Sequence, residues 1–156
     1  MKTPIHRFKT LKGYTIFENG MMMGKMGKYL KPRPERGNKE KITGYSYRVY
    51  FDIGAFDDYS YQQTSSKKQS KTIPVHRLVM ETFRPIDDYP PDELKDVWDD
   101  TPEVIKQWVR KTALIDHVDN DPSNNNIKNL RWSDTLNNSN FRKEREFKWK
   151  FQKEKN

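Results

Sequence analysis

Residues 116–138 hold most of the chemically capable side chains of this chain, in the order Asp116-His117-Val118-Asp119, then Asn129-Leu130-Arg131-Trp132, then Asn138. A histidine imidazole has an unperturbed pKa near 6.5, so it is largely neutral at physiological pH and can accept a proton. Carboxylate and amide oxygens are hard ligands that suit Mg²⁺ or Mn²⁺. These residue types could therefore accept a proton and bind a hard cation.

The loop inside this stretch could also suggest a calcium site, because Asp119 and Asp121 are spaced two residues apart. The loop lacks the glycine and the distal glutamate of an EF-hand, which disfavours calcium. We expect both aspartates to shape the turn instead. Asn124, Asn125 and Asn126 are likewise interpreted as turn-forming residues.

Two short strands must position these residues. Ile115–Val118 and Ile127–Trp132 have strand character and enclose the polar loop 119–126, and Ser133 or Asp134 could begin a last helix through the basic tail. We expect Trp132 to be an apolar plug between this hairpin and a helix. Upstream, a shared helical face predicts a core helix that ends before Pro85, with its apolar positions at Val75, Leu78, Val79 and Phe83.

The N-terminal half predicts strands. Tyr14–Phe17 and Met21–Met23 flank an Asn19-Gly20 turn, and strand character returns at Tyr45–Phe51 and at Thr72–Val75. Between them, residues 32–41 predict an exposed basic loop, and a segment that includes Ser65–Lys71 predicts a mobile hairpin loop. We expect the aromatic residues of the third strand to belong to the sheet core, namely Tyr45, Tyr47, Tyr50 and Phe51.

Residues 92–112 predict two helical pieces. The second has Thr101 as its N-cap, Pro102 at its first position and Glu103 in its first turn. Residues 81–115 hold 9 acidic and 5 basic side chains, whereas residues 1–80 hold 6 acidic and 16 basic ones. We expect the acidic segment to lie away from a DNA-binding cleft or to screen non-specific binding, because it repels phosphate.

The motifs resemble those of the HNH endonucleases, also called ββα-metal or His-Me finger nucleases, and most closely the phage homing-endonuclease branch. Val75-His76-Arg77-Leu78-Val79 is similar to a helix that precedes the D-H-x-D strand, the N-L-x-W strand and the final Asn in that family. The resemblance covers residues 75–83 and 115–140, and more weakly 8–50. It implies an α+β fold in which a β-rich N-terminal region precedes a ββα-metal motif with extra helices.

The resemblance also implies roles for single residues. His117 would be the general base, Asp116 and Asn138 would be ligands of one Mg²⁺ or Mn²⁺, and Asn129 would bridge the hairpin loop. His76 is a further active-site candidate, although a packed histidine is equally compatible with its position. The candidate DNA contacts are Arg48, Arg77, Arg131, Arg142 and Lys143.

Three regions follow from these motifs and from the charge. Residues 1–72 would form a β-rich, basic, DNA-contacting region. Residues 73–141 would form the nuclease core, with an acidic helical insertion at about residues 86–113, and residues 142–156 would form a basic tail.

Composition favours a polyanionic partner. The net charge is +8 and the pI is about 9.5, so nucleic acid is the first candidate and an anionic membrane surface the second. The absence of cysteine excludes disulfides and cysteine-bound zinc, so we expect no structural zinc. We find neither a signal-peptide pattern nor an apolar run of membrane-spanning length, so we expect a cytoplasmic protein without a membrane partner.

The sequence therefore predicts a metal-dependent endonuclease that cuts double-stranded DNA as a monomer or homodimer, in the cytoplasm of a bacterial or phage-infected cell. An alternative is a non-catalytic DNA-binding or regulatory protein that retains an HNH-like fold. An RNA-binding module is weaker, because no aromatic stacking motif stands out.

Overall fold

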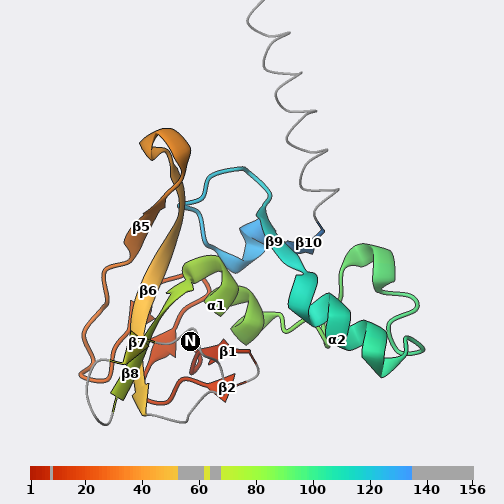
Figure 1. The fold of residues 1–156 in the computed structure, drawn as a ribbon, viewed down its shortest axis with the longest axis horizontal. Coiled ribbons are helices and arrows are strands. Elements are labelled where there is room, and N and C mark those ends of the chain that lie inside the picture. The colour runs from red at the N-terminus through yellow and green to blue at the C-terminus, as the bar shows by residue number, and fades with distance from the viewer. Residues whose placement is uncertain (8, 53–61, 64–67, 135–156) are drawn as a thin grey trace, which may run out of the picture.

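The computed structural model describes the chain except for residues 8, 53–61, 64–67 and 135–156. The described part contains strands, two α-helices and three short 3-10 turns (Figure 1). The strands are β1 (Ile5–His6), β2 (Lys9–Thr10), β3 (Thr15–Ile16), β4 (Met22–Met23), β5 (Arg33–Arg36), β6 (Ile42–Asp52), β7 (Gln62–Gln63), β8 (Lys68–Pro74), β9 (Leu114–His117) and β10 (Leu130–Ser133). The helices are α1 (Val75–Phe83) and α2 (Glu103–Thr112), and the 3-10 turns are η1 (Asn38–Glu40), η2 (Asp92–Leu94) and η3 (Ile127–Asn129).

Two small hairpins begin the chain. β1 pairs with β2, which the sequence did not predict, and β3 pairs antiparallel with β4, which it did. The turn between β3 and β4 contains Gly20 with a φ of +86°, a left-handed conformation that favours glycine. The Asn-Gly pair therefore marked this turn correctly.

A four-stranded antiparallel sheet follows, in the order β5-β6-β8-β7. The prediction of a loop over residues 32–41 is wrong for Arg33–Arg36, which pair with β6 at the edge of the sheet. Pro34 is tolerated there, since an edge strand leaves one row of backbone groups unpaired. The hairpin loop predicted to include residues 65–71 is wrong for Lys68–Lys71, which belong to β8. Residues 65–67 of that loop lie outside the described part.

Helix α1 is the centre of the fold and matches its predicted bounds. It contacts β1, β6, β8, β9, β10 and η3 (Figure 1). Leu78, Val79 and Met80 are fully enclosed, because the helix packs between the sheet and the β9–β10 hairpin. Arg84 follows the last turn and its backbone N–H donates to the Met80 carbonyl.

The acidic segment forms only part of the predicted helical structure. Its first piece is the short turn η2 and its second is α2. Thr101 is not the N-cap: its hydroxyl donates to the Val97 carbonyl, and Pro102 occupies the cap position. Arg110 anchors α2 to the preceding segment through Asp87, and it also donates to Glu103 within the helix.

The β9–β10 hairpin is antiparallel, with His117 opposite Leu130 and Asp116 opposite Arg131. The returning strand is shorter than predicted, since Ile127–Asn129 form the 3-10 turn η3 before β10 begins. The Asn126 side chain accepts from the Lys128 N–H, which caps this turn. The helix predicted after Ser133 or Asp134 lies outside the described residues.

These elements give the mixed α+β fold that the sequence predicts. Trp132 is buried and its indole N–H donates to the Arg84 carbonyl, 2.9 Å away, so it joins β10 to the end of α1. Of the predicted sheet-core aromatics, Tyr47 is buried and Tyr45 half-buried, but Tyr50 is exposed. None of the described helices is long and apolar enough to cross a membrane.

Candidate active site

His117 is the last residue of β9, and its ring is half-buried. Its Nε2 lies 3.1 Å from Oδ1 of Asn125. The Asn125 amide nitrogen donates to the carbonyls of Pro122 and Ser123, so its oxygen must face the imidazole. A neutral His117 therefore carries its proton on Nε2. Its Nδ1, which no hydrogen bond within the described part of the chain reaches, is left as a proton acceptor.

His76, the second residue of α1, packs edge-on against His117 with ring centroids 5.5 Å apart. Burial lowers the pKa of His76 from its ordinary value of 6.5 to about 4, with smaller effects from His117 and Arg77. Its Nδ1 is enclosed and has no hydrogen-bond partner among the described residues. His76 is consequently a neutral ring packed against the ring of His117.

The buried state of His76 predicts a pH-dependent stability. Below a pH of about 6.5 an unfolded histidine binds a proton, whereas folded His76 stays neutral down to about pH 4. The unfolded state thus binds more protons in this range, and the free energy of unfolding should fall by on the order of 3 kcal/mol as the pH is lowered. Urea unfolding of the wild type and of His76→Phe at several pH values measures this contribution. Equal pH slopes for the two proteins would contradict it.

Asn129 ties the loop between β9 and β10 together. Its side-chain oxygen accepts from the Asp119 N–H, and its amide nitrogen donates to the Asn124 carbonyl and to the Asp119 carboxylate. The hydrogen bond from Asn124 contributes most to lowering the pKa of Asp119. The hydrogen bond from the Ser123 side chain contributes most to lowering the pKa of Asp121. Both carboxylates thus accept hydrogen bonds within the loop, which is the turn-shaping role that the sequence predicts.

The β3–β4 hairpin also contacts the loop between β9 and β10. The Ile127 N–H donates to the Glu18 carbonyl at 2.7 Å. A Cβ atom built on Gly20 would lie 2.8 Å from Cβ of Asn125 and 3.1 Å from Cγ1 of Val75. The β3–β4 turn therefore presses against the residue that holds His117.

Asp116 is 7% exposed and faces the neighbouring strand. Its Oδ2 accepts from Nη2 of Arg131 at 2.8 Å and from Nε at 3.2 Å. Arg131, a predicted DNA contact, is thus an ion-pair partner of a predicted metal ligand. Asn138 lies outside the described residues, and within the described ones no group of three His, Asp or Glu side chains could hold a metal.

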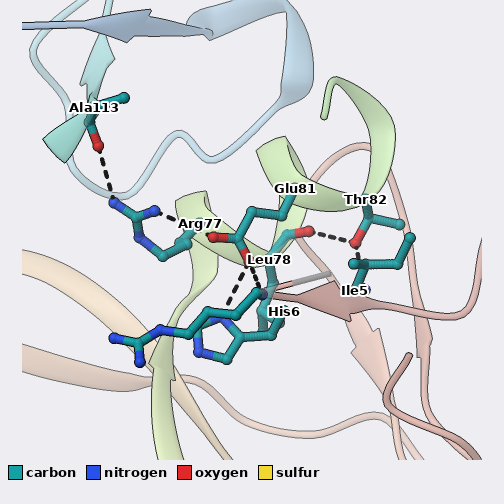
Figure 2. Close-up of polar contacts among 8 residues, drawn as sticks. Ile5, His6, Arg77, Leu78, Glu81, Thr82 and Ala113 are labelled. Atoms are coloured by element: carbon teal, nitrogen blue, oxygen red, sulfur yellow. Dashed lines mark hydrogen bonds and ion pairs between the residues drawn. The ribbon is translucent and has the colours of Figure 1, made fainter. Parts of the chain in front are cut away.

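Arg77, another predicted DNA contact, belongs to a network on α1 (Figure 2). It donates to Glu81 at 3.1 Å and to the Ala113 carbonyl at 3.3 Å. Glu81 also accepts from Nδ1 of His6 and from the Arg7 N–H. Although burial raises the pKa of Glu81, the hydrogen bond from His6 and the charges of His6 and Arg77 lower it overall. Glu81 therefore fastens the N-terminal residues to α1, and Arg77 links α1 to Ala113, the residue between α2 and β9.

Removing the carboxylate at the centre of this network should destabilise the fold. The Glu81 side chain is 15% exposed, so we expect Glu81→Ala to cost about 2–3 kcal/mol, somewhat below the ~3–5 kcal/mol of a fully buried pair. Glu103→Ala is the matched control, because Glu103 also pairs with an arginine but is 63% exposed. Its removal should leave the free energy of unfolding nearly unchanged, because solvent screens an exposed ion pair. Chemical denaturation measures both, and equal losses would contradict the network's role.

The remaining predicted DNA contacts are dispersed. Arg48 lies in β6, and its guanidinium donates to the Ser70 hydroxyl of β8. Arg142 and Lys143 lie outside the described residues. Among the predicted site residues, the structure brings His76 and His117 into contact and pairs Asp116 with Arg131.

Two residues of this site were not predicted from the sequence. Asn125 was interpreted as turn-forming, and nothing in the sequence distinguishes it from Asn124 or Asn126. Gly20 was predicted as part of a turn, but its contact with a residue more than a hundred positions later follows only from the fold.

A scan against models of known protein families finds no match, and a search of curated proteins finds none either. A search of solved structures finds a match with a structure described as "DNA binding and cleavage by the HNH homing endonuclease I-HmuI". The sequences are 22% identical, the TM-score is 0.47, and the match covers 88% of this chain and 57% of the other. This chain thus spans little more than half of that protein's length.

Proposed function

We propose that this protein is a metal-dependent DNA endonuclease of the HNH type that hydrolyses phosphodiester bonds in double-stranded DNA. The observation that carries the proposal is His117, whose Nε2 is tied to Asn125 and whose Nδ1 remains an acceptor. Its neighbours support the proposal by keeping the ring in one orientation. They are His76, whose ring packs against that of His117, and the Asn129-bridged loop that carries Asn125.

The reaction requires water to attack phosphorus in line with the departing oxygen. In the proposed mechanism Nδ1 of His117 accepts the proton of that water. The hydrogen bond to Asn125 keeps the Nε2–H tautomer and stabilises the imidazolium that results. The neutral, enclosed His76 beside it adds no competing charge.

The metal would be held by Asp116 and Asn138. A carboxylate and an amide supply the hard oxygen donors that suit Mg²⁺ or Mn²⁺. When bound, such an ion would stabilise negative charge on the departing oxygen. Two protein ligands are few, so we expect metal affinity to rise when DNA is present.

The rest of the proposal concerns binding. Residues 1–72 and the basic tail 142–156 would contact the DNA backbone, while residues 73–141 would carry the chemistry. The net charge of +8 supports a phosphate-rich partner. We further propose a homing-type nuclease of phage origin that works in the cytoplasm as a monomer or homodimer.

A second candidate is a DNA-binding protein without catalysis. The ion pair between Asp116 and Arg131 favours it, because the guanidinium already occupies one oxygen of a proposed metal ligand. Supercoiled plasmid incubated with the protein and Mg²⁺ or Mn²⁺ separates the candidates. We expect conversion to nicked or linear DNA that EDTA abolishes. Binding without conversion in both metals would leave the second candidate.

A further inference from the structure

A groove of about 510 Å³ lies beside the loop that holds His117. It is bounded by the β3–β4 turn, the segment leading into β5, the middle of β6 and the loop 119–126. The residues that matter here are Met21, Tyr29, Leu30, Lys31, Tyr45 and Asn125. Asn125 both lines the groove and bonds to His117, so one residue joins the groove to the candidate active site.

The groove is apolar, and two of its large side chains are exposed to solvent. Tyr29 is 62% exposed and Met21 44% exposed, although both are large and apolar. The Tyr29 ring lies tilted by 40° to that of Phe17, with centroids 6.0 Å apart. Tyr47 closes the floor, since its hydroxyl donates to the Gly20 carbonyl. Exposed apolar surface in a groove marks a binding site when a suitable partner exists.

The charge around the groove points to the chemistry of that partner. Lys31 lines the groove, and Lys25, Lys28 and Arg33 are exposed on the same segment of the chain as Tyr29. No acidic residue occurs between Asn19 and Pro34. An apolar peptide or a lipid tail would need no such row of cations. A nucleic-acid strand uses both features, because its phosphates pair with the cations and its bases stack on aromatic rings.

We propose that this groove takes an unpaired base of the DNA substrate, stacked on Tyr29, close to the phosphate that is attacked by the water His117 deprotonates. The inference rests on the proposed function, since it names a substrate subsite of the same enzyme. A base leaves a duplex most easily at a mismatch or a bulge. The protein should therefore prefer DNA that contains an unpaired nucleotide near the cleavage point.

The test measures binding in EDTA, so that no cleavage is needed. A labelled duplex with one bulged thymidine is compared with the fully paired duplex by fluorescence anisotropy at fixed salt. We expect the wild type to bind the bulged duplex about 10-fold more tightly, because stacking of one base on an aromatic ring contributes binding free energy of this size. Tyr29→Ala should abolish this preference and Tyr29→Phe should retain it. Tyr89→Ala, an exposed tyrosine of the acidic segment, is the matched control and should retain it.

A second readout locates the base. Bulged 5-iododeoxyuridine, irradiated in the complex, should crosslink to Tyr29 or Tyr45. Retention of the preference in Tyr29→Ala, crosslinks confined to other elements, or tighter binding of the matching RNA would each overturn the inference. Plasmid cleavage without a preference for the bulged duplex would reject the proposed base-binding role of the groove but not the proposed enzyme. A Tyr29-dependent preference without cleavage would reject the proposed enzyme and keep the nucleotide site.

Discussion

His117→Ala should lower the rate of plasmid cleavage by about 10²–10⁴-fold, the usual contribution of a positioned general base. The variant keeps Asn125 and the loop but lacks the only group proposed to accept the proton of water. Its affinity for DNA in EDTA should stay within a few-fold of the wild type, because the cations proposed to bind the backbone are unchanged. Single-turnover cleavage and anisotropy measure the two quantities separately.

The matched control is Val118→Ala. Val118 follows His117 directly and is exposed, so its truncation should leave cleavage unchanged. If His117→Ala cut DNA as fast as the control, His117 would not be the base. If instead it lost DNA binding in proportion to cleavage, its role would be in binding rather than in proton transfer.

The second large effect is expected for Gly20→Ala. An L-residue at a φ of +86° costs about 1–2 kcal/mol, and the new Cβ would overlap with Cβ of Asn125 at 2.8 Å. Relieving such an overlap costs about 1–3 kcal/mol more. We therefore expect Gly20→Ala to lose about 2–5 kcal/mol of stability in denaturant unfolding.

Gly20→Ala should also lower cleavage, by about 10²-fold, because Asn125 must move and His117 loses its anchor. Gly27→Ala is the matched control: its φ is +71°, but an added Cβ meets nothing within 4 Å. It should show the strain alone and keep full activity. Nitrogen NMR of the folded variants reports the His117 tautomer, and an unchanged Nε2–H signal in Gly20→Ala would contradict the positioning role.

Strong local patterns predicted their elements well. Helix α1 begins and ends where predicted, because its apolar spacing is regular and prolines flank it at positions 74 and 85. The β3–β4 turn was predicted because Asn-Gly favours a positive φ. The motif around His117 led to the resemblance because its residue types and order are contained within a short stretch of chain.

Weak local patterns failed where a distant partner decides the conformation. Arg33–Arg36 contains a proline and charges, yet it forms an edge strand because β6 offers unpaired backbone groups. Thr101 is a residue type that often caps helix N-termini, but its hydroxyl donates to the Val97 carbonyl instead. The predicted DNA contacts of Arg77 and Arg131 stay predictions; what the sequence did not indicate is that their guanidinium groups lie against Glu81 and Asp116.

By itself, the sequence determined which residue types could do chemistry here and where helix α1 and the β3–β4 turn lie, because residue type and periodicity act over a few neighbouring residues. Only the tertiary structure decided which nitrogen of His117 is the acceptor, since that depends on a hydrogen bond to one asparagine among three in a row. It also decided that a glycine from the first hairpin supports that asparagine, because contacts across such a separation exist only once the chain has packed.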